Sequence, residues 1–170
     1  MVELVLDQAA RLDCPSMPSD TDPGVRVHDE PARTTAVRKA STTWSEFPSL
    51  WPQLSADVWT CLRAGGVTRG CPNVMLYRDR PDGGVDVEIG VELRVPCELT
   101  GAVVASTLPG GQVASVEHRG PWSRMDQAYQ TFDVWREANH VPKPTVHWEV
   151  YGPHSDDPAE LTMTIFWLLG

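Results

Sequence analysis

An internal repeat limits the folds open to this chain more than any other feature of its sequence. When the sequence is shifted by 78 residues, Trp44 falls on Trp122, and further along the chain Tyr77 matches Tyr151 at a shift of 74. Other identities at the first shift are Val25 with Val103, Pro31 with Pro109, Ala36 with Ala114, and Ser45 with Ser123. Two units of the same structure are therefore expected to pack about a pseudo-twofold axis, with a cleft where they meet.

Each unit is predicted to contain two strands, a helix and two more strands, because runs typical of strands flank an apolar stripe with helical spacing. The helices are expected to begin at Ser45 and Ser123, which are both good N-cap residues. The first two strands of each unit are expected to form a hairpin, with turns at Glu30-Pro31 and at residues 108–111. The predicted strands are 25–29, 34–42, 73–79 and 85–95 in the first unit, and 102–107, 112–118, 145–151 and 161–169 in the second. The predicted fold class is α+β, with duplicated strand–strand–helix–strand–strand units forming an antiparallel sheet with a pseudo-twofold ligand cleft.

The length of 170 residues suits a single domain with a sizeable core. This domain is predicted to cover residues 23–170, with repeat one at 23–97 and repeat two at 98–170. Residues 1–22 are predicted to be an N-terminal extension or linker, because they end in an irregular stretch rich in Pro, Ser and Asp. They are too few for a helix-turn-helix domain.

Charge and cysteine usage exclude several classes of function. The formal net charge is −9, and Lys39 and Lys143 are the only lysines, so no nucleic acid is expected as a direct partner. No apolar run is long enough to cross a membrane and no secretory pattern is present, so a cytoplasmic location is predicted. The four cysteines are irregularly spaced and expected to be free thiols, and neither a metal site nor a cofactor is predicted. A protein partner at the acidic surface stays open.

The most informative difference between the two repeat units is at Glu149. His147, Glu149 and Tyr151 share one face of a predicted strand, since side chains alternate along a strand. The residue equivalent to Glu149 in the first unit is Met75, so a carboxylate occurs in one half only. The helix is expected to cover the apolar set on the other face of the strand, which is Val146, Trp148 and Val150. Glu149 is therefore expected to face the cleft, where a desolvated carboxylate suits cation recognition or acid–base chemistry.

Seven tryptophans are unusual for this length and call for a core, a pocket or both. Trp44 and Trp122 occupy equivalent positions, so they are expected on opposite walls of the cleft, where they can clamp a flat ligand. The alternative is that they serve only as hydrophobic staples before the helices. The tryptophans expected to fill the two helix–sheet cores are Trp51, Trp59, Trp135 and Trp148.

The motif His118-Arg119-Gly120-Pro121-Trp122, followed by Ala128-Tyr129, Trp135, Glu149-Val150-Tyr151 and a last apolar strand, resembles the GyrI-like small-molecule-binding domain. That domain also forms the effector-binding part of some AraC-type and MerR-type multidrug-responsive regulators. The resemblance implies a cleft in which Glu149 meets cationic aromatic ligands, and it transfers an aromatic of the last strand onto Phe166. The complete set of predicted ligand-binding residues is Glu149, Trp44, Trp122, Tyr77, Tyr151, His147 and Phe166.

Two functions are predicted as alternatives. The first is the binding of a bulky, flat aromatic and often cationic small molecule, for xenobiotic or antibiotic sensing or sequestration. The second follows from stand-alone family members that resemble hydrolases opening the strained cyclopropane ring of DNA-alkylating natural products. In that hydrolase Glu149 is the general base, and Tyr151 or His147 donates a hydrogen bond to the developing oxyanion.

Overall fold

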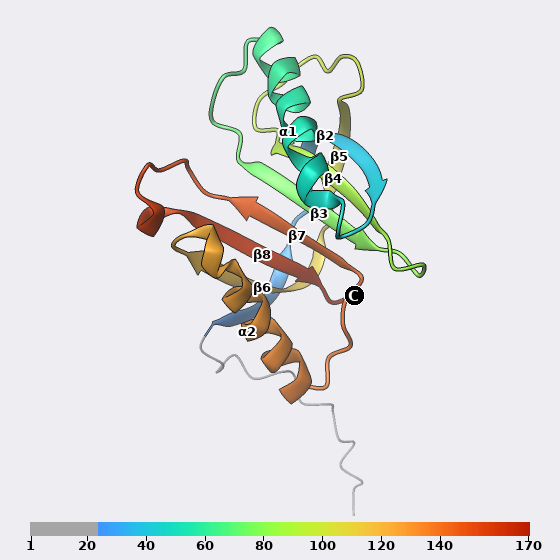
Figure 1. The fold of residues 1–170 in the computed structure, drawn as a ribbon, viewed down its shortest axis with the longest axis vertical. Coiled ribbons are helices and arrows are strands. Elements are labelled where there is room, and N and C mark those ends of the chain that lie inside the picture. The colour runs from blue at the N-terminus through green and yellow to red at the C-terminus, as the bar shows by residue number, and fades with distance from the viewer. Residues whose placement is uncertain (1–23) are drawn as a thin grey trace, which may run out of the picture.

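The computed structural model describes residues 24–170, and the predicted N-terminal extension at residues 1–22 lies outside them. The described chain is a mixed α+β domain, as predicted, with one eight-stranded sheet and two α-helices (Figure 1). The strands are β1 (Val25–Glu30), β2 (Arg33–Thr42), β3 (Asn73–Asp79), β4 (Val85–Glu92), β5 (Val104–Leu108), β6 (Gly111–Arg119), β7 (Val146–Tyr151) and β8 (Thr162–Leu168). The helices are α1 (Phe47–Ala64), α2 (Met125–Ala138), and the short 3-10 helices η1 (Trp122–Arg124) and η2 (Pro158–Glu160). None of the described helices is long and apolar enough to cross a membrane.

The strand order β1-β6-β8-β7-β3-β4-β2-β5 reflects the sequence repeat, and every neighbouring pair is antiparallel. Reading outwards from the centre, β7, β8, β6 and β1 on one side match β3, β4, β2 and β5 on the other. The pseudo-twofold axis therefore passes between β3 and β7, where Met75 lies directly opposite Glu149. Met75 and Glu149, which occupy equivalent positions in the two repeats, are thus neighbours at the centre of the sheet.

The two predicted hairpins do not form, although their strands do. The strand β1 pairs with β6 and β2 pairs with β5, so each half of the sheet receives its edge strand from the other repeat. The connections 30–33 and 108–111 pass each other closely: a Cβ at Gly110 would lie 2.8 Å from the backbone nitrogen of Ala32. Gly110 is therefore needed for this crossing, where the sequence pattern indicated a tight turn.

Both helices begin later than predicted. Helix α1 has Glu46 at its N-cap, and α2 has Arg124 there after the turn of η1, so neither Ser45 nor Ser123 caps a helix. In α1, Pro48 lies within the first two helical positions, where the fixed φ of proline is tolerated best.

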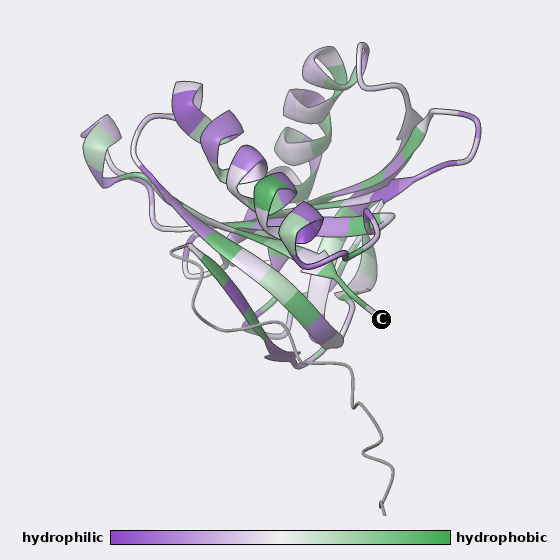
Figure 2. Ribbon diagram, turned by 90° about the horizontal axis from the view of Figure 1, so that it is seen from below, coloured by the Kyte–Doolittle hydropathy of each residue, from purple (hydrophilic) through white to green (hydrophobic). Residues whose placement is uncertain are grey.

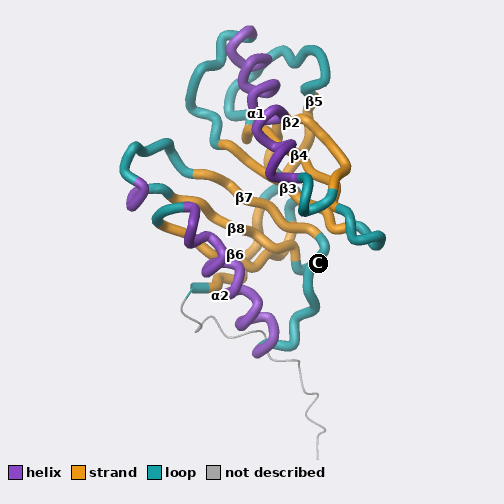
Figure 3. The backbone as a smooth tube through the Cα atoms, in the orientation of Figure 1, coloured by secondary structure: helices purple, strands orange, loops and turns teal. Residues whose placement is uncertain are grey.

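Both helices lie on the same face of the sheet (Figure 2). Helix α1 buries Leu54, Val58, Cys61 and Leu62, and α2 buries Ala128, Phe132 and Trp135. The prediction that a helix covers Trp148 is wrong, because Trp148 points to the opposite face and Glu149 points to the face that carries the helices. Figure 3 shows α1 and α2 over opposite halves of the sheet, and β7, which carries Glu149, is a central strand of the sheet.

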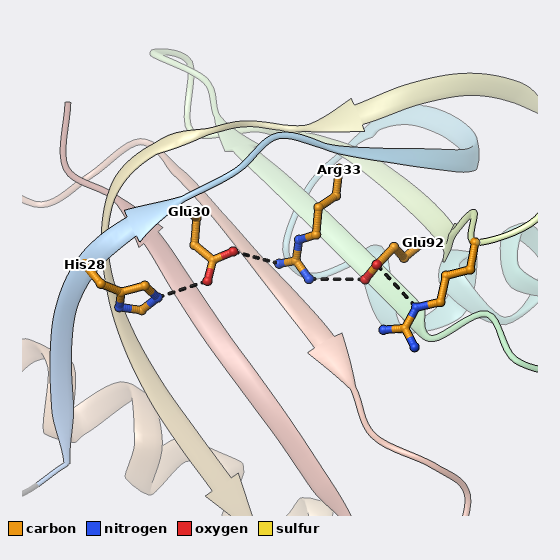
Figure 4. A network of polar contacts seen from close by, with 5 residues as sticks. His28, Glu30, Arg33 and Glu92 are labelled. Atoms are coloured by element: carbon orange, nitrogen blue, oxygen red, sulfur yellow. Dashed lines mark hydrogen bonds and ion pairs between the residues drawn. The ribbon is translucent and has the colours of Figure 1, made fainter.

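The helix-free face of the sheet is concave and has a core of its own, in which Trp148 stacks on Phe166 with ring centroids 5.3 Å apart. The guanidinium of Arg33 in β2 lies 5.4 Å from the ring centroid of Phe166 in β8, although three strands separate β2 from β8. A chain of charged contacts runs from His28 through Glu30 and Arg33 to Glu92, and so joins β1 to β4 (Figure 4). The curved sheet is therefore closed by contacts between its two halves.

Candidate functional site

The carboxylate of Glu149 is the centre of the candidate site. The chain contains three tyrosines, and all of them donate a hydrogen bond to this group. Tyr129 from α2 lies 2.5 Å from Oε1, while Tyr151 from β7 and Tyr77 from β3 lie 2.7 Å and 3.1 Å from Oε2. Glu149 itself is only 2% exposed. The three hydroxyl donors satisfy this buried carboxylate as a hydrogen-bond acceptor. None of the ion pairs described for residues 24–170 brings a side-chain cation to it.

The strand register explains why these donors converge. Tyr77 and Tyr151 are equivalent in the repeat, and Met75 between them lies opposite Glu149. The thioether sulfur of Met75 is 3.3 Å from the Tyr77 hydroxyl and 3.7 Å from the Tyr151 hydroxyl. The two symmetric tyrosines therefore bracket one carboxylate and one thioether, and Tyr129 is the asymmetric third donor.

Burial controls the electrostatics of the group. Loss of hydration raises the pKa of Glu149 above its ordinary value, and the three tyrosine hydrogen bonds only partly oppose this rise. The pKa values of Tyr77, Tyr129 and Tyr151 are also raised, first by burial and then by the charge of Glu149. The tyrosines therefore remain protonated donors at any physiological pH. Proton binding in this cluster is confined to the carboxylate.

A cavity of about 420 Å³ opens above Glu149, between the two helices. Phe47 and Trp51 of α1 form one wall, and Trp122 and Met125 form the other. The floor comes from β3 and β7, and one end is closed by residues 152–154 after β7. Glu149 is the single carboxylate in this lining, so a largely apolar and aromatic space that is partly open to solvent holds one buried carboxyl group. Such a volume and lining are typical of sites for small molecules.

Four of the seven predicted site residues line this cavity: Glu149, Tyr77, Tyr151 and Trp122. His147 lies beside it, stacked on the Tyr77 ring at 4.8 Å, and burial lowers the pKa of His147 to about 4. Trp44 packs behind the α1 wall, with ring centroids 5.3 Å from Tyr77 and 6.0 Å from Phe47. It therefore does not face Trp122 across the cavity.

Phe166 does not belong to this cavity. It lies opposite Trp148 in the pairing of β7 with β8, so both rings point to the concave face of the sheet, away from Glu149. The residues of β8 on the face of Glu149 are instead Met163, Ile165 and Trp167.

Sequence reasoning missed Trp51 and Tyr129 as site residues. Trp51 was expected in a core, but it is 38% exposed and lines the cavity. A helix turns by about 100° per residue, so Trp51 sits beside the stripe of Leu50 and Leu54, and Tyr129 sits beside Ala128. Large aromatics at the edge of an apolar stripe are the signal that could have found both. Among residues 24–170, no three His, Cys, Asp or Glu side chains come together to hold a metal ion.

Residues 24–169 match the family model of the GyrI-like small molecule binding domain. No curated protein sequence matches the chain significantly. Among solved structures, EcmrR in an EcmrR–DNA complex is 20% identical with a TM-score of 0.63, and the match covers 84% of this chain and 56% of that one. This chain therefore spans about half of the EcmrR chain. The separate EcmrR C-terminal domain is 18% identical, with coverage of 86% and 96% and a TM-score of 0.59.

Two further structures share the fold at lower identity. SAV2435, solved with bound tetraphenylphosphonium, is 12% identical with a TM-score of 0.61, and the match covers 86% of this chain and 93% of that one. A hydrolase encoded by lin2189 from Listeria innocua is also 12% identical, with coverage of 86% and 92% and a TM-score of 0.54.

Proposed function

Because the chain belongs to the GyrI-like small-molecule-binding domain family, we propose that it binds bulky, flat aromatic cations in the cavity above Glu149. The location proposed for this activity is the cytoplasm, and its purpose is the sensing or sequestration of multiple drugs or antibiotics.

The observation that carries the proposal is the buried carboxylate with three uncharged donors. A carboxylate offers about four acceptor positions, and tyrosine hydroxyls occupy three of those of Glu149, so one acceptor position remains without a described partner. Its charge has lost most of its hydration, and an organic cation in the cavity would compensate for that loss. A delocalised cation needs no hydrogen bond, and the faces of Trp51 and Trp122 would add cation–π attraction.

The SAV2435 complex supports a bulky aromatic cation as ligand, though not a flat one, since tetraphenylphosphonium is tetrahedral and is bound by a protein of this fold. The Met75 and Met125 side chains favour a broad ligand range, because flexible thioethers adapt to differently shaped apolar surfaces.

A matched pair of ligands tests the role of the charge. Methyltriphenylphosphonium and triphenylphosphine oxide have nearly the same shape, but only the first is a cation. Binding is followed by quenching of tryptophan fluorescence, since Trp51 and Trp122 line the cavity. The variant Glu149→Gln should weaken phosphonium binding by at least about 30-fold, which corresponds to about 2 kcal/mol, and should change oxide binding by less than threefold.

Glu137→Gln is the matched control, because Glu137 is an exposed carboxylate on α2 outside the cavity lining. It should leave both affinities unchanged. Equal losses for both ligands in Glu149→Gln would show that Glu149 only maintains the fold. If neither ligand binds the unaltered protein below about 1 mM, the binding function is rejected.

Hydrolysis of a strained cyclopropane is the second candidate, and the 2.7 Å contact between Tyr151 and Glu149 favours it. Glu149 would take a proton from water as the water oxygen bonds to a ring carbon conjugated with a carbonyl. The ring C–C bond would break, and its electron pair would pass to the carbonyl oxygen, which accepts a hydrogen bond from Tyr151. The proton held by Glu149 would then pass to that oxygen, which restores the carboxylate.

Mass spectrometry with excess compound separates the two candidates. Hydrolysis predicts repeated turnover to a product that is heavier by one water molecule. This turnover should be lost in both Glu149→Gln and Tyr151→Phe. Stoichiometric protection of the compound without product would leave binding alone. A protein partner at the acidic surface, the remaining proposal, predicts co-purification that is indifferent to Glu149→Gln.

A further inference from the structure

A second cavity, of about 630 Å³, begins where the cavity above Glu149 ends. The two share Asn73 of β3, Tyr151 of β7 and residues 152–154. The second cavity lies at the end of the sheet, between the segment 69–72 before β3 and the segment after β7. The two cavities are therefore adjacent, and they meet at Tyr151 and residues 152–154.

The charges of the second cavity are opposite to those of the first. Arg69 and Arg94 line it from two different loops, against the single carboxylate of Glu117. Arg94 donates to Glu92 at 3.3 Å but stays 56% exposed, and Arg69 makes no ion pair with any residue of the described part of the chain. The protein has a net charge of −9 and the first cavity contains the carboxylate of Glu149, whereas two arginines line the second cavity. The sign of the local charge therefore differs between the two cavities. We call the second cavity the arginine-lined cavity.

An aromatic wall of fixed position adjoins the arginines. The indole nitrogen of Trp59 in α1 donates to the Asn73 side chain at 2.8 Å, and the Arg63 guanidinium lies 5.9 Å from the indole ring. Trp59 lines the arginine-lined cavity, and Asn73 lines both cavities. A flat ligand passing from one to the other would therefore meet a held indole surface.

We propose that the arginine-lined cavity binds an anionic oxygen group of the ligand whose cationic aromatic body lies above Glu149, so that the preferred ligands are zwitterionic. This inference rests on the proposed function. Guanidinium groups pair with carboxylates and phosphates in a bidentate geometry, which makes Arg69 and Arg94 suitable partners. Tyr151 stands two strand positions beyond Glu149, about 6.6 Å, so the ligand's opposite charges must be separated by more than about 7 Å. Amino acids and short betaines are thereby excluded.

(5-Carboxypentyl)triphenylphosphonium, a free carboxylic acid, and its methyl ester test the proposal. They share one triphenylphosphonium cation, and a chain of five methylene groups places the carboxylate of the acid more than about 7 Å from it when extended. The double variant Arg69→Gln/Arg94→Gln should weaken binding of the acid roughly tenfold and change binding of the ester by less than twofold. Glu117→Gln should strengthen binding of the acid, because it removes a like charge. Arg119→Gln is the control, since Arg119 is an exposed arginine outside both linings.

Equal responses of acid and ester to the double variant would overturn the arginine proposal, and so would no response of either. The ester also keeps the two proposals apart. One outcome refutes only the anion site: the ester binds and loses affinity in Glu149→Gln, but the affinity for the acid is unchanged in the double arginine variant. If the ester does not bind the unaltered protein, the proposed function fails, and the zwitterion proposal fails with it.

Discussion

Removing the Tyr129 hydroxyl should raise the pKa of Glu149 further. Tyr129 makes the shortest hydrogen bond to this carboxylate, at 2.5 Å, and it does so from α2. Tyr129→Phe keeps the ring that packs edge-on against Trp167, with centroids 5.6 Å apart, so the change deletes one donor and little else. Because the lost bond stabilises the ionised carboxylate, the protonated form gains in relative terms.

The size of this effect follows from the kind of bond. A hydrogen bond contributes about 1.5–3 kcal/mol when its acceptor is charged and about 0.5–1.5 kcal/mol when it is neutral, so the difference of about 1–1.5 kcal/mol should raise the pKa of Glu149 by about 1 unit. Tyr77→Phe, which removes the longer bond of 3.1 Å, should raise the pKa by less.

The shift also changes how stability depends on pH. The pKa of Glu149 is raised in the folded protein, so its contribution is fully present below the unfolded value of about 4.5 and is lost as pH rises through the folded value. In Tyr129→Phe this loss should extend about 1 pH unit further and should reduce the free energy of unfolding at pH 8 by about 1–1.5 kcal/mol more than at pH 4.

NMR titration of the carboxyl carbon of Glu149, with urea unfolding across the same pH range, measures both quantities. The matched control is Trp167→Phe, which alters the packing around Tyr129 but keeps the donor. An unchanged or lowered pKa in Tyr129→Phe would refute the reasoning, since it would mean that Tyr129 does not stabilise the ionised form.

Two more predictions concern the surroundings of the site and the fold. His147→Phe should make the stability of the protein less sensitive to acid, because burial lowers the pKa of His147 to about 4. Between pH 6.5 and 4 the wild-type free energy of unfolding should fall by about 3 kcal/mol more than that of the variant, which a comparison of their urea midpoints measures. Parallel pH profiles would contradict this. Gly110→Ala should destabilise the fold by about 1–3 kcal/mol, because a Cβ at Gly110 would lie 2.8 Å from Ala32; an unchanged thermal midpoint would show that the two connections separate easily.

The elements of this fold could be predicted because each has a local pattern, whereas the partners of the strands could not. Alternation of polar and apolar residues in β1 shows which side chains share a face, and that pattern is the same whether β1 pairs with β2 or with β6. The Pro-Gly-Gly turn signal favoured the local hairpin. It was misleading because a small residue at Gly110 also permits two backbones to pass each other. The exchange of edge strands between the repeats therefore cannot be predicted from the periodicity of polar and apolar residues.

The candidate site was predictable along its strands and unpredictable across its helices. Strand alternation placed Glu149 and Tyr151 on one face correctly, and the repeat added Tyr77. The position of Trp51 and Tyr129 depends on how each helix rolls over the sheet, a shift of one residue around the helix axis. Sequence reasoning also put the helices on the Trp148 face, since it assumed that an apolar face must be covered by a helix. A curved sheet instead filled that face with its own side chains.

Duplication explains how a small domain holds the buried carboxylate of Glu149, whose described hydrogen-bond partners are all tyrosine hydroxyls. Two like units bring equivalent residues together across the pseudo-twofold axis, and a glutamate in both would place two carboxylates side by side, where they could not both ionise. Met75 removes this conflict while Tyr77 and Tyr151 stay symmetric, so both halves supply donors to the one carboxylate that remains. The repeat thus provides two symmetric tyrosine donors, and a single difference between its halves supplies the one carboxylate to which the proposed function assigns ligand recognition.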